Sequence, residues 1–422
     1  MANWYKLDNA AKIFPFIYSP KDTNSFRLSC VFKQSINALL LMPALKKALK
    51  RFPTFCVKLK NGLFWQYFDH NNNTPIIKKE NPNLCLSVHP KKNNGYLFTL
   101  SYNEKRLILE VFHALSDGTG ALEFFKCICY YYLIECGYEI ENNGEVLTDE
   151  YEKLALEKED SFSWSYDKNI KPHEEEESAY QLKGHSYPDV FAGIFHFVMP
   201  LDKLKEVSRS YNATITEYLS GAILKAIYDI YYVYENKPKR SVALFLPVNA
   251  RKFFESQSVR NFALYARIHT RYEEDVTLES LIKLVKSTLE KEITKEALSS
   301  RISYNVRFEK YWFIRILPLF LKKIGMKIGY HVQGTDANTI SFSNLGKVVL
   351  PKSMEQYIDQ FEFLIPPNHK LPYSIGAVSY NNKFVLSFGC RFIERNFIRH
   401  IVNQLVKDGL EIELQTNDLE VE

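Results

Sequence analysis

The 422-residue sequence lacks the patterns that mark nucleotide, metal or serine-hydrolase chemistry. It contains no Walker loop and no strand-linked GxGxxG, and its 16 glycines leave little material for phosphate-binding loops. It has neither HExxH nor paired-cysteine spacing, and its histidines do not group into a metal site. The GxSxG turn of many serine hydrolases is also missing. We therefore expect no metal, and we set nucleotide hydrolysis and serine hydrolysis aside.

Charge and cysteine content exclude further partners. Lys and Arg number 54 against 49 Asp and Glu, which leaves a net charge of +5 at pH 7. A dedicated nucleic-acid binder carries a more concentrated basic field, so we expect no nucleic-acid partner. The seven cysteines are odd in number, lie mostly in apolar runs and lack CxxC spacing, which is typical of buried thiols in a reducing compartment. Residues 1–20 lack the features of a secretory signal, so we expect a cytoplasmic protein.

The most apolar stretch, Tyr311–Gly329, is not expected to cross a membrane. Arg315, Pro318 and the pair Lys322–Lys323 interrupt it, and charges are costly to bury in a bilayer. The stretch fits either a helix that lies on a membrane or a helix that faces the protein core. We favour the core-facing helix.

Length and pattern predict an α/β protein with two lobes. A chain of 422 residues is too long for one compact core, and strand patterns alternate with helix patterns along both halves. A polar, acidic segment without either period separates the halves. We therefore predict a first lobe at 1–165, an acidic linker at 166–187 and a second lobe at 188–422. Each lobe is expected to be a mixed sheet flanked by helices, and the two are expected to be similar.

Two hairpins are predicted in the first lobe. Asn61-Gly62 lies between two strand patterns and is typical of a type I′ turn, which needs two residues of positive φ. Strand patterns at 95–102 and 106–112 flank a polar turn, and the second of them is apolar enough to be central in a sheet. A similar hairpin and helix recur near the C-terminus, where Arg391 takes the position that matches His113. If the lobes are copies, only one of them carries an imidazole there.

One short pattern, His113-Ala114-Leu115-Ser116-Asp117-Gly118, combines a base, a charge and a turn where a strand leads into a helix. The strand end would hold the His113 ring on a rigid backbone, while Asp117 is suited to cap the helix and Gly118 to let the chain turn tightly. The positive helix end disfavours imidazolium by roughly 0.3–1 kcal/mol, which keeps the ring basic near pH 7. A carboxylate beside the ring would oppose this, so we predict that Asp117 points away and pairs with Arg251. The alternatives are a core histidine and an exposed surface arginine.

This HxxxDG pattern resembles that of the chloramphenicol-acetyltransferase-like superfamily of CoA-dependent acyltransferases. Other segments are similar to its second-half helix, its Pro-Val-(Asn/Asp)-x-Arg strand exit and a late strand beside its tunnel, namely Ala213–Ile227, Leu244–Phe254 and Thr339–Val348. The segments RFPTF, FWQYF, RNF and SNLG look most similar to microbial alcohol acetyltransferases and their condensation-domain relatives. The sequence departs from the plant BAHD branch because DFGWG is absent. It departs from the HHxxxDG of peptide-condensation domains because Phe112 replaces the first histidine.

The resemblance implies an active-site tunnel between the lobes, which acyl-CoA enters from one face and the acceptor from the other. His113 would act as general base and take the proton from an acceptor hydroxyl or amine as that atom attacks the thioester, without an acyl-enzyme. Ser343 or Asn344 would donate a hydrogen bond to the oxyanion, although the segment around them fits a strand-ending turn equally well. Asp117, Gly118 and Arg251 would be structural.

The implied activity is transfer of an acetyl group from acetyl-CoA to an alcohol hydroxyl by a monomer. Acyl-CoA is then a co-substrate whose contacts we leave unassigned, because a solvated helix face accounts for the basic residues at 315–327 more simply than phosphate binding. Three alternatives stay open. They are transfer to an amine, condensation with an acyl group on a carrier protein, and binding without turnover on the same scaffold.

Overall fold

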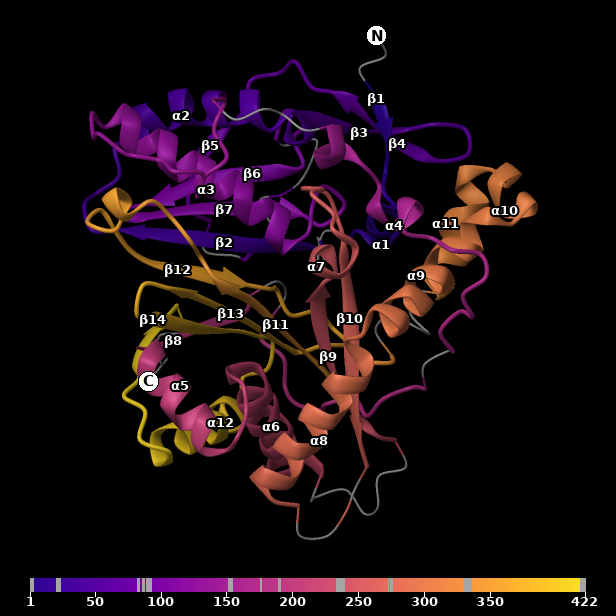
Figure 1. Cartoon of the computed structure of the whole chain (residues 1–422), viewed down its shortest axis with the longest axis vertical. Coiled ribbons are helices and arrows are strands. Elements are labelled where there is room, and N and C mark those ends of the chain that lie inside the picture. The colour runs from indigo at the N-terminus through magenta and orange to yellow at the C-terminus, as the bar shows by residue number, and fades with distance from the viewer. Residues whose placement is uncertain are drawn as a thin grey trace.

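Two large β-sheets lie one above the other in the computed structural model, with helices on their outer faces (Figure 1). The structure describes residues 4–19, 24–81, 84–85, 88, 93–150, 155–174, 177–188, 191–232, 240–271, 273, 276–329 and 336–417. The strands are β1 (Trp4–Lys6), β2 (Ser25–Phe32), β3 (Val57–Asn61), β4 (Gln66–His70), β5 (Ile77–Lys79), β6 (Phe98–Asn103), β7 (Arg106–Phe112), β8 (Gly193–Pro200), β9 (Val242–Asn249), β10 (Ala263–Thr270), β11 (Ile340–Lys347), β12 (Ile358–Leu364), β13 (Tyr373–Tyr380), β14 (Lys383–Cys390) and β15 (Glu413–Thr416). The helices are α1 (Phe14–Ile17), α2 (Ala38–Arg51), α3 (Gly118–Glu135), α4 (Ser161–Trp164), α5 (Leu201–Ser210), α6 (Ile215–Ile227), α7 (Arg251–Phe254), α8 (Leu278–Glu292), α9 (Lys295–Lys310), α10 (Trp312–Ile316), α11 (Leu319–Gly329) and α12 (Asn396–Lys407).

The first sheet has the strand order β12-β2-β7-β6-β5. β2 and β7 are buried along nearly their whole length, which explains their almost continuous apolar runs. α3 contacts β2 and packs beside α2, so its apolar face is covered. Outside this sheet, β1, β4 and β3 form a small sheet of their own. β7 is the third of the five strands, and the HxxxDG segment follows directly after its C-terminal end.

The second sheet has the order β10-β9-β11-β13-β14-β8-β15. β11 runs parallel to both of its neighbours, β9 and β13, and the remaining pairs are antiparallel. The helix α6 packs against α8 and α12, and their apolar side chains join those of the sheet in a second core. α6 begins where the sequence signal places it, because Thr214 and Glu217 form a complete capping box.

One strand crosses between the two halves of the chain. β12 belongs to the C-terminal half, yet it extends the first sheet by pairing antiparallel with β2, where Phe361 lies opposite Cys30. The segment 166–187, predicted as a linker, forms no helix or strand in its described residues beyond an isolated bridge from Ser186 to Phe392. The predicted α/β class with mixed sheets and flanking helices is confirmed.

Two sequence-based predictions about local structure are wrong. Asn61 and Gly62 do not form a two-residue turn, because Asn61 pairs with Gln66 and residues 62–65 make the loop between β3 and β4. The stretch Tyr311–Gly329 is not a core-facing helix in its described side chains, residues 311–326, since α10 has no buried side chain and Trp312 is 72% exposed. Among the described residues, no helix combines the length and apolar character needed to cross a membrane.

Candidate active site

His113 follows directly after β7 and is held from three sides. Its backbone N–H donates to the carbonyl of Asn24 at 2.9 Å. Its ring stacks on Phe14, with centroids 4.4 Å apart and an interplanar angle of 16°, and meets the edge of Phe26 at 5.3 Å. The side chain is half-buried and lines a cavity. These contacts orient the ring while one part of it stays accessible.

Asn261 decides which ring nitrogen of His113 can act as a base. Its Oδ1 lies 3.1 Å from Nδ1 of His113, and its Nδ2 lies 3.5 Å from Oδ2 of the buried Asp8. A carboxylate only accepts, so Asp8 orients the amide with its oxygen toward the imidazole. Nδ1 then carries the proton, and Nε2 keeps its lone pair.

Burial lowers the pKa of His113 below its ordinary value of 6.5. The cause is loss of water around the ring, which disfavours the imidazolium, and the negative charge of Asp117 offsets this only in part. The imidazole must be neutral to accept a proton. The lowered pKa therefore keeps the His113 ring neutral at lower pH values than an ordinary histidine would be.

Asp117 occupies a buried polar site directly beside the histidine segment. It caps α3 by accepting from the N–H of Gly120 at 3.0 Å, and it accepts from the N–H of Phe262 at 2.7 Å. Nη1 and Nη2 of Arg251 lie 2.9 and 3.0 Å from its two oxygens. The predicted ion pair is therefore present, and it joins the HxxxDG segment to the start of α7.

Arg251 is itself fixed by backbone carbonyls. Its Nε donates to the carbonyl of Ser258 at 2.7 Å, and its Nη2 donates to that of Arg260 at 2.6 Å. The side chain of Asn249 accepts from both its backbone N–H and its Nη1. Because the loop that carries Ser258 and Arg260 also carries Asn261, the Asp117–Arg251 pair helps to place the partner of His113.

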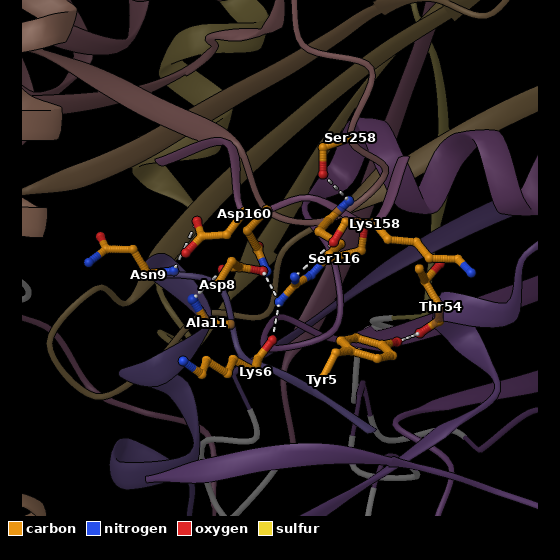
Figure 2. Close-up of polar contacts among 12 residues, drawn as sticks. Tyr5, Lys6, Asp8, Asn9, Ala11, Thr54, Ser116, Lys158, Asp160 and Ser258 are labelled. Atoms are coloured by element: carbon orange, nitrogen blue, oxygen red, sulfur yellow. Dashed lines mark hydrogen bonds and ion pairs between the residues drawn. The ribbon is translucent and has the colours of Figure 1, made fainter. Parts of the chain in front are cut away.

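A second cluster anchors the same loop from the N-terminal side. Arg260 is buried and donates to the carbonyls of Lys6 and Lys158 at 2.7 and 3.0 Å, while its Nη2 lies 3.5 Å from Asp8. Figure 2 shows Asp8 among Lys6, Ala11 and Lys158. Burial raises the pKa of Asp8 to about 6, against the opposing charge of Arg260. Three distant chain segments therefore meet behind Asn261.

Glycines 118 and 120 provide space at the start of α3. Gly118 was predicted to supply a tight turn, but its φ is not positive, and a Cβ there would lie 2.7 Å from Cδ2 of Leu345. A Cβ on Gly120 would overlap the carbonyl oxygen of Val259 and Oγ of Ser116. Gly120 is not among the predicted site residues, yet the backbone of Val259, from the C-terminal half of the chain, approaches it more closely than any backbone approaches Gly118.

We expect Gly120→Ala to lower the free energy of unfolding by roughly 1–3 kcal/mol, because backbone on the opposite side must move to admit the methyl group. The matched control is Gly325→Ala, since a Cβ at Gly325 meets nothing within 4 Å. Gly137→Ala is unsuitable because Gly137 has positive φ. Chemical denaturation of both variants checks this. Equal stability of the two would show that the contact at Val259 relaxes freely.

A cavity of about 1700 Å³ contains the accessible part of His113. Both halves of the chain line it: Phe26 and Gly118 come from the N-terminal half, and Pro247 and Ser343 from the C-terminal half. A pocket for a drug-sized ligand usually measures 300–1,000 Å³, so this one has room for two reactants. The predicted tunnel requires a cavity at His113, and this cavity meets that requirement. That it opens on two faces of the molecule stays a prediction.

Ser343 and Asn344, the predicted oxyanion donors, lie in β11 and line the same cavity. Nδ2 of Asn344 donates to Oγ1 of Thr216 at 3.2 Å, and its Oδ1 accepts from the N–H of Gly346 at 2.9 Å. Asn344 therefore shapes the register shift in β11 that follows it, and among the described residues one of its amide hydrogens has no partner. Ser343 is buried at the cavity wall, and its role as an oxyanion donor stays a prediction.

No metal site accompanies these residues. Within the ranges that the structure describes, no three His, Cys, Asp or Glu side chains gather as they would around a metal ion. All seven cysteines are free, and five of them are buried.

Solved structures share the fold of this chain, although no family profile matches the sequence and no curated protein does. TRI101 of Fusarium graminearum, crystallised with coenzyme A and T-2 mycotoxin, is 11% identical with a TM-score of 0.62, and the match covers 97% of this chain and 100% of that one. Polyketide synthase associated protein 5 from Mycobacterium tuberculosis is 11% identical over 95% of this chain and 96% of its own, with a TM-score of 0.59. The chain has the chloramphenicol-acetyltransferase-like fold.

A third match widens the group that shares the chloramphenicol-acetyltransferase-like fold. The epimerization domain from the third module of tyrocidine synthetase B is 13% identical, with a TM-score of 0.58, and 97% of this chain and 95% of that one are covered. The resemblance first noticed in the HxxxDG segment thus extends over nearly the whole chain as a likeness of fold.

Asn261, Asp8 and Phe14 are site residues that no sequence pattern indicated. Asn261 belongs to the RNF segment, which was noted only as similar to a family. Its contact with His113 spans 148 positions of the chain, so no local pattern reports it. The tertiary structure is what brings these residues together.

We expect Asn261→Leu to lower kcat by roughly tenfold or more with little change in KM, because Nδ1 of His113 loses its acceptor and the basic tautomer is no longer fixed. A swap, Asp8→Asn/Asn261→Asp, restores an acceptor and places a charge beside the ring. That charge favours imidazolium, so the acid limb of kcat/KM should move to higher pH by about one unit. Rates measured from pH 5 to 8 check both. If the acid limb of kcat/KM did not move in the swapped variant, Asn261 would have a packing role only.

Proposed function

We propose that the protein is an acyl-CoA-dependent acyltransferase that moves an acetyl group to an alcohol hydroxyl. The observation that carries this proposal is the state of His113, whose Nδ1 is bonded to Asn261 while the ring lines a cavity shared by both lobes. The fold shared with TRI101, which was crystallised with coenzyme A, supports the choice of donor.

In the proposed reaction, Nε2 of His113 accepts the hydroxyl proton as the alcohol oxygen bonds to the thioester carbonyl carbon. The carbonyl oxygen becomes an oxyanion, to which the Ser343 hydroxyl donates a hydrogen bond. When the tetrahedral species collapses, the carbon–sulfur bond breaks, and the proton passes from His113 to the departing thiolate. Ester and free coenzyme A are the products, and His113 is neutral again.

The cavity offers suitable groups for the charged end of the donor. Lys252, Arg307 and Lys347 line it and are exposed, and such cations pair with phosphate groups. The interior near His113 is instead aromatic, through Phe14 and Phe26, which suits the pantetheine arm and an apolar acceptor.

The direct experiment is incubation with acetyl-CoA and a panel of alcohols, with a thiol reagent that reports released coenzyme A. Alcohol-dependent thiol release, together with the acetyl ester in the extract, is the expected result. Absence of release with every alcohol, under conditions where acetyl-CoA raises the melting temperature, would show a binding protein without turnover.

The second candidate is transfer from an acyl group tethered to a carrier protein. It is favoured by the fold likeness to the epimerization domain of tyrocidine synthetase B and to the starter condensation domain of rhizomide synthetase, which was crystallised with C8-CoA and Leu-SNAC. A phosphopantetheinylated carrier that raises the melting temperature, when acetyl-CoA does not, would select this candidate.

A further inference from the structure

The end of α9 together with α10 and α11 carries an apolar patch that no part of the described chain covers. Figure 1 shows α10 and α11 projecting at one side of the molecule, beyond α9. Trp312 is 72% exposed, Phe320 68%, and Leu63 of the β3–β4 loop 74%. More than half of the large hydrophobic side chains that are exposed in the described chain belong to this patch, which consists of Leu63, Phe64, Phe308, Tyr311, Trp312, Phe313, Ile316, Phe320, Leu321 and Ile324. An exposed patch of this extent marks an interaction surface.

The patch is held in place by specific contacts. The N–H of Leu319 donates to the carbonyl of Leu63 at 3.1 Å. Lys322 is buried beneath α11, where its Nζ donates to the carbonyl of Phe64 at 2.8 Å and lies 3.9 Å from the centre of the Trp65 ring. These contacts hold α11 against the β3–β4 loop, so the apolar side chains lie on a surface that the fold keeps in place.

Within residues 307–326, which carry most of the patch, the exposed charges have a single sign. Residues 311–329 contain no Asp or Glu. Arg307, Lys310, Arg315 and Lys323 are all exposed, whereas the neighbouring Glu309 is half-buried and paired with Lys12. Aromatic and aliphatic side chains among basic ones, on helices too short to cross a bilayer, are the composition of segments that lie in the interface of an anionic membrane. A second copy of the chain would bring like charges together.

The patch lies beside the opening of the cavity. Phe308 and Tyr311 are exposed on the surface and also line the cavity that contains His113. α11 contacts α1, the helix that begins with Phe14, which stacks on the histidine ring. A molecule held at the patch is therefore next to the entrance to the catalytic cavity.

We propose that this apolar patch binds the surface of a membrane that contains anionic lipid, and that a lipid-soluble alcohol enters the cavity from that surface. The second half of this statement rests on the proposed acyl transfer, whereas the first does not. The basic residues contact the headgroups, and the aromatic side chains enter the boundary between headgroups and acyl chains.

Cosedimentation with vesicles tests the docking. The full chain should bind vesicles of phosphatidylcholine with phosphatidylserine more tightly than vesicles of phosphatidylcholine alone. Trp312→Ser/Phe320→Ser, which alters no cavity residue, should weaken binding to the mixed vesicles roughly tenfold or more. Arg315→Glu/Lys323→Glu should abolish the preference for phosphatidylserine. The control Leu39→Ser/Val406→Ser, which removes exposed side chains from α2 and α12, should bind like the unaltered protein.

Two outcomes would overturn the docking proposal: equal vesicle binding by both serine variants, or a dimer in solution that Trp312→Ser/Phe320→Ser dissociates while no vesicle binds. Acyl transfer is measured separately. Trp312→Ser/Phe320→Ser should leave turnover of a short soluble alcohol unchanged and raise KM for a long-chain alcohol supplied in vesicles. Vesicle binding without transfer to either alcohol would refute the proposed function and leave the docking intact, whereas equal KM for the vesicle-borne alcohol would refute entry from the membrane.

Discussion

Replacing His113 with alanine should lower the rate of coenzyme A release from acetyl-CoA and alcohol by about 10²–10⁴, because the proposed reaction gives the hydroxyl proton to Nε2 of His113. Binding of the donor should change little, since in the proposed reaction the ring acts on the acceptor hydroxyl and not on the phosphates. The measurement is kcat by thiol release, with the dissociation constant for acetyl-CoA determined in parallel. The loss should therefore appear in kcat.

The matched control is His185→Ala, because the side chain of His185 is 90% exposed and pairs with Glu394 at the surface. It should turn over like the unaltered protein. The Phe14 and Phe26 rings that flank His113 could close over the vacated space, so the melting temperature of His113→Ala must also be compared. A folded His113→Ala protein with full turnover would remove the catalytic role of this residue and with it the proposed mechanism.

The parts of the site that follow from short-range chemistry could be predicted from the sequence. The β6–β7 hairpin, the cap at Asp117 and the capping box at Thr214 each depend on residues within a few positions, so the pattern alone indicates them. The ion pair between Asp117 and Arg251 spans 134 positions, and it was predicted only because an isolated carboxylate beside a base needs a cation.

What could not be predicted depends on tertiary contacts that leave no periodic signal. β12 joins the first sheet although its sequence lies in the second half, since strand pairing is set by the whole fold. Asn61-Gly62 has the composition of a tight turn, yet the loop 62–65 is longer, and α11 rests on it through Leu63 and Phe64. The apolar stretch 311–329 was assigned to the core because hydrophobicity does not distinguish a buried face from a docking face. Its exposure is visible only in the structure.

Changing Asp117 to asparagine should lower the free energy of unfolding by about 3–5 kcal/mol, because it leaves the Arg251 guanidinium without its carboxylate in a buried site. The amide keeps the size of the side chain, but its NH₂ group takes the place of one carboxylate oxygen. In the unaltered protein the two oxygens accept hydrogen bonds from Gly120, Phe262 and Arg251. Denaturant titration measures the loss. Asp202→Asn, at an exposed position in the first turn of α5, is the control and should change stability by less than about 0.5 kcal/mol.

The same variant separates structure from chemistry at the site. In the fraction of Asp117→Asn that is folded, kcat should fall less than in His113→Ala, since the carboxylate touches the loop of Asn261 and not the reacting atoms. Removing its charge should also lower the pKa of His113 further, because that charge is what opposes the effect of burial, so the acid limb of kcat/KM should move to lower pH. A variant with unchanged stability and no activity would contradict this assignment and place Asp117 in the catalytic machinery.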